Sequence, residues 1–456
     1  MVLVEVYERF VKRAPICVRA RAVLERALSP ALIHPLFDPM AERQYTRTLL
    51  FSTGVDRMGL VVCRARPSVH AAYQACAERR EGSLRSLYEK IARRETGVSE
   101  AWGRHSALEW QPVIEALGAE GPTGVPGDRR KILDGNPLAG AEHRLQPLRP
   151  TRAGALPGQA RVVLDPQVMR ACQVVLGEDG HAQGRSMTER VRALAQAGDV
   201  GGAERNFCPT AFLFGFAHRQ AGFVIRPPAS TLKILFLGEA VAKGRTDTGT
   251  LFEQAMTLQD AQDERLEVRR ITVVLDTPTR DGDSEIHRRT SLPETVLSAD
   301  PVAKWYRRRG AVETAFPESE ATLAGEINTL GSPKAALFAF CLAWVAYPIL
   351  AVVKAALREA HGEAAQKTLS GDYLADQMAG TRRGLEIAVP HETWDTLAGL
   401  AVGAFARLLR EGAGDARRAA YKKHPRRPKK PRPLRQRGDK IKHVATSRLL
   451  AAQVRA

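Results

Sequence analysis

The sequence predicts a mixed α+β and α/β protein, and three observations along its 456 residues lead to that class. Short apolar runs that end in an acid, KILD at 131–134 and RVVLD at 161–165, alternate with helical sequence, which is typical of a sheet with chemistry at its strand ends. The pattern before about residue 125 is helical. From about residue 232 to 292 the sequence is strand-like, and it becomes helical again after Asp300.

Two short helices around a glycine turn are predicted in the N-terminal part. The first begins at Pro67 and runs towards Arg80, and Gly82 with Ser83 interrupts it. Apolar residues on one face of the second are Leu84, Leu87, Tyr88 and Ile91. The pair permits a DNA-binding helix-turn-helix and equally an ordinary helical hairpin.

An uncharged run of 19 residues, 335–353, would be about 28 Å long as a helix, enough to cross a membrane. The run is rich in alanine, contains Pro348 and is flanked by charged sequence, so we expect a buried core helix. The first residues carry charges where a secretory signal would be apolar, so we expect a cytoplasmic protein. The six cysteines lack CxxC spacing, which argues against zinc or a disulfide framework.

The chain is strongly basic, with a net charge of +18, and much of this charge is concentrated near its end. Residues 417–442 contain 13 Lys and Arg and one acid, Asp439, so this stretch carries +12 and the remaining chain +6. The prolines that interrupt this stretch predict a tail that is disordered when free. Its positive charge predicts contacts to DNA phosphates, and a role in solubility is the alternative. The candidate contacts are Lys422, Lys423, Arg426, Arg427, Lys429 and Lys430.

Tyr306, Arg309 and Glu313 are spaced three and four residues apart, so a helix would carry all three on one face. A carboxylate can hold a metal ion, while a phenol and a guanidinium can hold a phosphate. An Arg–Glu pair within one helix, beside a half-buried tyrosine, is the alternative.

This spacing opens the Tyr-Arg-Glu-Lys signature of the IS-four family of insertion-sequence transposases, which are DDE-type enzymes, and the chain resembles that family over roughly residues 50–450. Further blocks occur in the family's order: DGN at 134–136, EDGHAQGRS at 178–186, ERNFCPTAFLFGFAHRQAGFVIR at 204–226 and EINTLGSPKAALFAF at 326–340. The resemblance implies an RNase H-like catalytic domain, interrupted by a β-rich insertion between the second and third acids.

The resulting domain division combines this implication with the change of sequence pattern. The predicted parts are a helical N-terminal region with possible binding of DNA ends (1–125), the first part of the catalytic domain (126–230), the β-rich insertion (231–300), the completion of the catalytic domain by the Glu313 helix (301–360), a helical C-terminal region (361–416) and the basic tail (417–456).

The resemblance implies that Asp134, Glu204 and Glu313 are the catalytic acids and hold two Mg²⁺ ions, with Mn²⁺ as a substitute. Asp134 ends an apolar run, although a plain Asp-Gly turn is the alternative there, and Asp165 is the fallback first ligand. Relatives carry Asp at the position of Glu204, and the extra methylene moves the carboxylate by about 1 Å.

Tyr306 and Arg309 would then contact the phosphate at the transposon end, and Arg226 would reach DNA. The expected protein binds inverted-repeat ends as a homodimer on double-stranded DNA, without a membrane, and performs cut-and-paste transposition in a prokaryotic nucleoid.

Several positions depart from the family's pattern, and the alternative is a catalytically decayed relative that only binds DNA. Glu320 stands where relatives have the signature lysine, and Gly310 where a tryptophan is common. Pro317 would kink the helix beside Glu313 at a cost of about 3 kcal/mol.

Overall fold

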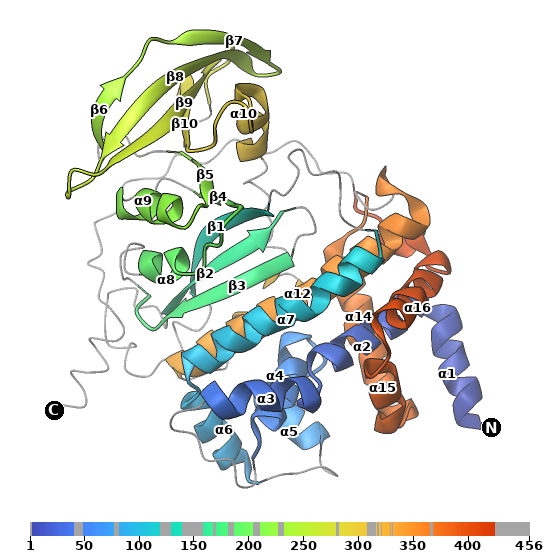
Figure 1. The fold of residues 1–456 in the computed structure, drawn as a ribbon. Helices are drawn as coiled ribbons and strands as arrows, with labels where there is room; N and C mark the ends of the chain where they lie inside the picture. Colours follow the sequence, from blue (N-terminus) through green and yellow to red (C-terminus); the bar gives the residue numbers. More distant parts are fainter. Residues whose placement is uncertain are drawn as a thin grey trace, which may run out of the picture.

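A computed structural model shows a helical body with a long mixed sheet beside it, part of which rises away from the helices (Figure 1). The described residues are 2–40, 49–76, 82–118, 129–138, 158–166, 170–180, 187–203, 210–226, 232–279, 282–307, 316, 319–320, 322–328, 330, 332–364 and 368–424.

The helical body is built from both ends of the chain. Its N-terminal helices are α1 (Val2–Arg13), α2 (Pro15–Ala27), α3 (Pro30–Met40), α4 (Phe51–Val62), α5 (Val69–Ala75), α6 (Leu84–Ala92) and α7 (Thr96–Ala116). Its C-terminal helices are α12 (Pro333–His361), α14 (Gly371–Ala388), α15 (His391–Ala398), α16 (Val402–Gly414) and the short 3₁₀ helix η6 (Arg418–Tyr421). Buried apolar residues of both groups form one hydrophobic cluster.

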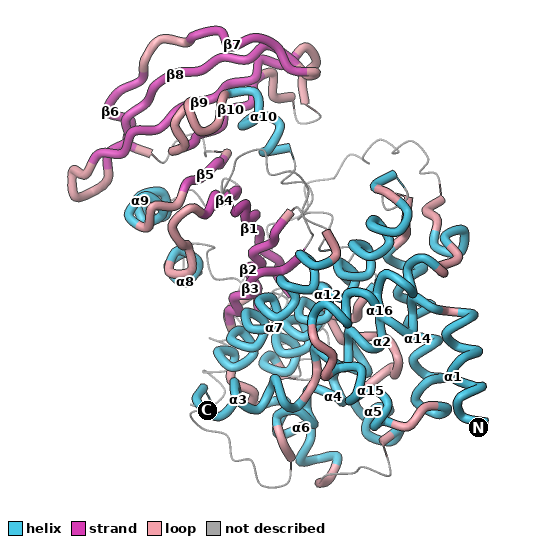
Figure 2. Tube along the Cα trace, turned by 45° about the vertical axis from the view of Figure 1, so that its right-hand side comes forward, coloured by secondary structure: helices cyan, strands magenta, loops and turns pink. Residues whose placement is uncertain are grey.

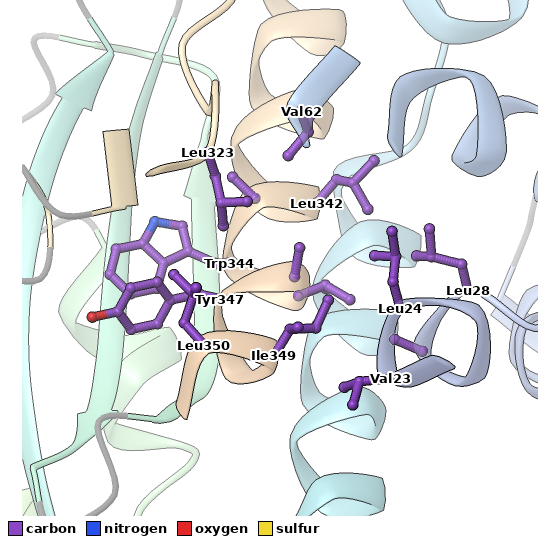
Figure 3. Packing of buried hydrophobic residues seen from close by; sticks show 14 of the residues in the cluster. Val23, Leu24, Leu28, Val62, Leu323, Leu342, Trp344, Tyr347, Ile349 and Leu350 are labelled. Carbon is purple, nitrogen blue, oxygen red and sulfur yellow. The ribbon is translucent and has the colours of Figure 1, made fainter. Parts of the chain in front are cut away.

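The predicted core helix at 335–353 is confirmed as part of α12, which α2, α4, α6, α7 and α16 contact. Among the described residues, α12 is the one helix long and apolar enough to cross a membrane, and its apolar window is wholly buried inside the protein. In Figure 3, Trp344 and Tyr347 lie on one side of α12, and Leu24 and Leu28 of α2 lie beyond its other side. A helix that is apolar all round needs such enclosure.

The predicted helix pair around Gly82 is present as α5 and α6, and Ser68 and Ser83 cap their N-termini. Leu87 and Ile91 are buried, as predicted. Tyr88, which the helical spacing placed on the same face, is exposed.

Five strands form the part of the sheet that lies against the helical body: β1 (Arg129–Leu138), β2 (Gly158–Asp165), β3 (Arg170–Gly177), β4 (Asp199–Ala203) and β5 (Gly222–Ile225). Their order is β3-β2-β1-β4-β5. Strand β2 runs antiparallel to its neighbours β1 and β3, whereas β4 and β5 run parallel to β1. The helices α8 (Thr188–Arg192) and α9 (Thr210–His218) precede and follow β4 in the chain. The strands predicted from KILD, RVVLD and GFVIR are therefore confirmed.

The strand-like stretch after residue 232 is also confirmed, as β6 (Lys233–Leu237), β7 (Val241–Thr246), β8 (Gly249–Gln259), β9 (Arg265–Leu275) and β10 (Glu285–Thr290). These strands continue the same sheet, because β10 pairs with β5 at two positions. Helix α10 (Ala299–Arg307) follows and packs on β5, β7, β8 and β9. Figure 2 shows these strands curving away from the helical body.

The sequence predicted a disordered tail from residue 417 onward, but in the structure the chain remains packed as far as His424. Tyr421 is buried, and its carbonyl accepts a hydrogen bond from the backbone N–H of Ser370 at 2.7 Å. The N–H of Lys423 donates to the carbonyl of Thr368 at 2.7 Å. This short backbone pairing holds residues 417–424 against α14, and the rest of the predicted tail lies outside the described residues.

Leu342→Ala tests the dependence of the helical body on α12. Leu342 is fully buried, so its truncation should lower the free energy of unfolding by about 2–5 kcal/mol, measured by urea denaturation. Ile387→Ala, at an apolar side chain that is 88% exposed, is the matched control and should change it by less than about 0.5 kcal/mol. Equal effects of the two substitutions would contradict the central packing of α12.

Candidate functional site

The sequence predicted that Asp134 ends a strand, but in the structure Asp134 lies within β1. The apolar run ends there, but β1 continues to Leu138 because it stays paired with β2 as far as Gly158. The side chain is half-buried, and its Oδ1 accepts a hydrogen bond from the N–H of Gly135 at 2.8 Å. A carboxylate held by its own backbone has a fixed orientation, which suits a ligand of a metal ion.

The end of β4 adjoins Asp134 in the sheet. The pairing of these parallel strands ends with Leu133 opposite Ala203, the last residue of β4. Asp134 is the residue after Leu133 in β1. Glu204, the predicted second acid, is the next residue in the sequence and lies outside the described residues. The same holds for Arg309, Glu313, Arg426, Arg427, Lys429 and Lys430, while Tyr306 is described only as backbone within α10.

Helix α10 covers the sheet face on which Asp134 lies. Ile132 pairs with Gly202 and Gly202 with Val224, so these residues and Asp134, two positions after Ile132, share one face. On that face Val224 packs in one hydrophobic cluster with Val302 of α10. The helix that carries Tyr306 therefore lies on the same side of the sheet as the first predicted acid.

After α10 the described chain resumes on the helical body. The ring of Phe316 lies 5.3 Å from that of Trp344 in an edge-on contact, and Figure 3 shows Trp344 on α12. Thr322 is buried, and the N–H of Ala324 donates to the carbonyl of Val62 at 2.8 Å. These contacts anchor the chain three residues beyond Glu313.

Asp199 and Asp165 lie at the opposite end of β1 from Asp134. Asp199 is 1% exposed and is paired with Lys131 at 2.6 Å and with Arg129 at 3.0 Å. It pairs in register with Arg129, five residues before Asp134, which corresponds to roughly 16 Å along the strand. Asp165 ends β2, three residues beyond the partner of Asp134, and lies 3.7 Å from Arg170. Neither acid lies beside Asp134 in the strand register, and the fallback role of Asp165 as the first ligand stays a prediction.

A cavity of about 960 Å³ opens at this other end of the sheet, lined by residues of the strands and of α7, α8 and α9. Sequence reasoning did not predict it, and the only signal was the basic run before KILD. Its charged lining residues are Arg104, Arg129, Arg130, Lys131, Arg170, Arg219, Asp165 and Asp199. The cations outnumber the acids, so the cavity suits an anionic group better than a metal ion.

Arg161 gives the surroundings of Asp134 a positive charge. It pairs in register with Gly135, where a Cβ atom would lie 2.0 Å from the Arg161 Nη1. Burial lowers the pKa of this guanidinium, and the charge of Asp134 raises it. A larger residue after Asp134 would displace the end of the Arg161 side chain.

A complete metal site cannot be built from the described residues, among which no three His, Cys, Asp or Glu side chains cluster. Asp134 supplies one carboxylate, a hard oxygen donor of the kind that Mg²⁺ prefers. The other two predicted ligands lie outside the described part of the chain.

The described candidate DNA contacts differ in their environment. Arg226 follows β5 and forms an ion pair of 2.7 Å with Asp283, so a DNA phosphate would compete with this carboxylate. Lys422 and Lys423 are exposed at the end of the packed chain. Their side chains are accessible to a phosphate backbone.

Glu320, at the position of the family's lysine, has a carboxyl group that is unusually easy to protonate. Partial burial raises its pKa from 4.5 to about 7, although the N–H of Glu326 donates to its Oε2 at 3.1 Å. A lysine at this position would carry a positive charge, whereas the carboxyl group of Glu320 is neutral or negative.

Comparison with known proteins gives little sequence similarity. No family model matches the chain, and no curated protein matches it. Among solved structures, the piggyBac transposase synaptic complex with hairpin DNA, determined by cryo-EM, aligns with a TM-score of 0.36 and 8% identity. The alignment covers 83% of this chain and 84% of that chain. A likeness this loose assigns no function.

Glu320→Gln tests the raised pKa. The folded state binds the Glu320 proton more tightly than the unfolded state, so the native chain loses this stabilisation as pH rises from about 4.5 to about 7. We expect the variant to be more stable than the native chain above pH 7, with the difference in free energy changing across that window, measured by urea denaturation at each pH. A difference independent of pH would contradict it.

Proposed function

We propose that the chain is a DDE-type DNA transposase related to the IS-four family, which binds inverted-repeat ends and performs metal-dependent strand cleavage and transfer. The observation that carries this proposal is the parallel pairing of β1 and β4. Leu133 is paired with Ala203, so Asp134 and Glu204 each follow one member of that pair in the sequence. Two acids following adjacent residues of parallel strands are suited to share a metal site.

The sheet supports an RNase H-like catalytic domain with an insertion. Five mixed strands precede the meander β6–β10, and α10 follows it. The meander thus separates Glu204 from Glu313, which is the arrangement that the resemblance to the IS-four family implies.

Two anchors on either side of Glu313 support its role as the third acid. Glu313 follows Arg307, the end of α10, by six residues and precedes Phe316 by three. Helix α10 packs on the face of Asp134, and Phe316 packs on α12, which itself contacts β2. In this proposal Glu313, three residues before Phe316 in the sequence, supplies the third carboxylate.

Each residue has a separate task in this proposal. Asp134, Glu204 and Glu313 would hold two Mg²⁺ ions, or Mn²⁺, which when bound supply charge neutralisation for in-line displacement at phosphorus. Tyr306 and Arg309 would bind the end phosphate by charge-assisted hydrogen bonds. Arg226 and the basic tail would add contacts to double-stranded DNA, on which the protein acts as a homodimer in a prokaryotic nucleoid.

A decayed transposase that only binds DNA is the second candidate, and Arg161 favours it. The positive charge of Arg161 interacts with the carboxylate of Asp134 and thus opposes the approach of a cation. The longer side chain of Glu204 acts in the same direction, because a misplacement of about 1 Å can reduce a rate a hundredfold.

A cleavage assay on DNA with the element's own ends tests the catalytic proposal, with Mg²⁺ and separately with Mn²⁺. We expect nicking by the native chain, its loss in Asp134→Asn and Glu313→Gln, and an increase of up to about a hundredfold in Glu204→Asp. Asp165→Asn is the matched control and should keep the native rate, since Asp165 lies at the other end of the sheet.

Three results of this assay would change the conclusion. Nicking only by Glu204→Asp would mean that the extra methylene of Glu204 inactivates an otherwise intact active site. Binding of the ends without cleavage by every variant would favour the decayed protein. Absence of DNA binding would reject both functions.

Removal of residues 425–456 tests the tail while keeping the packed segment that ends at His424. This deletion takes away 11 Lys and Arg and one acid. Binding to DNA of any sequence should weaken, and the slope of log K against log salt should become shallower by about 0.9 for each lost phosphate contact, measured by fluorescence anisotropy. An unchanged slope would reject the tail as a DNA contact.

A further inference from the structure

The strand β6 exposes its apolar side chains on both faces. Ile234, Leu235, Phe236 and Leu237 are 42%, 46%, 55% and 40% exposed, although successive side chains of a strand point to opposite sides. A continuous apolar run is typical of a strand that is covered on both faces. The sequence of β6 is therefore typical of a strand that is buried on both faces, whereas within one chain its side chains are exposed.

The free edge of β6 is open as well. The sheet order ends at β6, and β7 continues along the same side of β8, with Val241 55% exposed. No other described strand pairs with β6. An apolar edge with unpaired backbone N–H and C=O groups is a template for another strand, and it is a poor surface for DNA phosphates.

We propose that β6 pairs antiparallel with β6 of a second copy of this chain. With a twofold axis through Phe236, Leu235 of one copy stands opposite Leu237 of the other, and Lys233 opposite Glu239. Each opposite-charge pair occurs twice, because a twofold interface repeats every contact. The pairing forms without DNA and thus goes beyond the dimer on DNA in the proposed function.

The charges at both ends are available for this pairing. Glu239 is exposed and has no hydrogen-bond or ion-pair partner among the described residues. Lys233 is 3.8 Å from Asp263, and both side chains are exposed, which makes a weak contact. A β-bulge between Ile234 and Phe236 shortens the regular ladder, so we expect an interface of modest size and micromolar affinity.

Sedimentation velocity of the full chain without DNA, over a concentration series, tests the interface. The native chain should form dimers at micromolar concentration, whereas Phe236→Lys, which sets two like charges at the axis, should remain monomeric. Ile387→Lys is the control, because Ile387 is the most exposed large apolar side chain and lies on α14; it should dimerise like the native chain. Circular dichroism verifies that each variant is folded.

Charge reversal tests the register. Lys233→Glu and Glu239→Lys should each raise the dimer Kd about tenfold, because two attractive pairs become repulsive, and the double variant should restore the native Kd. A native chain that stays monomeric, or a Phe236→Lys variant that still dimerises, would overturn the interface. Failure of the double variant to recover would overturn this register. Cleavage and DNA binding are measured separately, so either proposal can fail alone.

Discussion

The enclosure of α12 is the constraint on which the rest of the structure depends. This helix presents apolar side chains in every direction, so it is stable only when surrounded. Helices α2, α4, α6 and α7 from the beginning of the chain and α16 from its end supply most of that cover. The two ends of the sequence are thereby held together in one core, and the strands between them are added at its side, where α12 contacts β2 and β3.

The mixed direction of the strands determines which acids can act together. Leu133 of β1 pairs with Ala203 of the parallel strand β4, and in the sequence Asp134 and Glu204 each follow one member of this pair. The same register carries Asp199 to the far end, where two cations neutralise it. Burial of such a group is tolerated because it is paired, so Asp199 is a structural acid beside a basic cavity.

The β-rich insertion serves two purposes in this arrangement. Its strands extend the sheet beyond β5 and support α10 on the sheet face of Asp134, and in the sequence the insertion lies between Glu204 and Glu313. Its edge strand, β6, leaves apolar residues uncovered, which connects the architecture of one chain with the proposed pairing of two.

Local patterns in the sequence determined the elements: apolar runs predicted β1, β2 and β5, Pro67, Gly82 and helical spacing predicted α5 and α6, and uncharged length predicted the buried part of α12. The same patterns misjudged Tyr88, the end of β1 and the start of the tail, because exposure and strand pairing depend on neighbours remote in sequence. Only the tertiary structure decided that Asp165 and Asp199 are separated from Asp134 and that Arg161 approaches Gly135. These are consequences of strand register, which no single segment encodes.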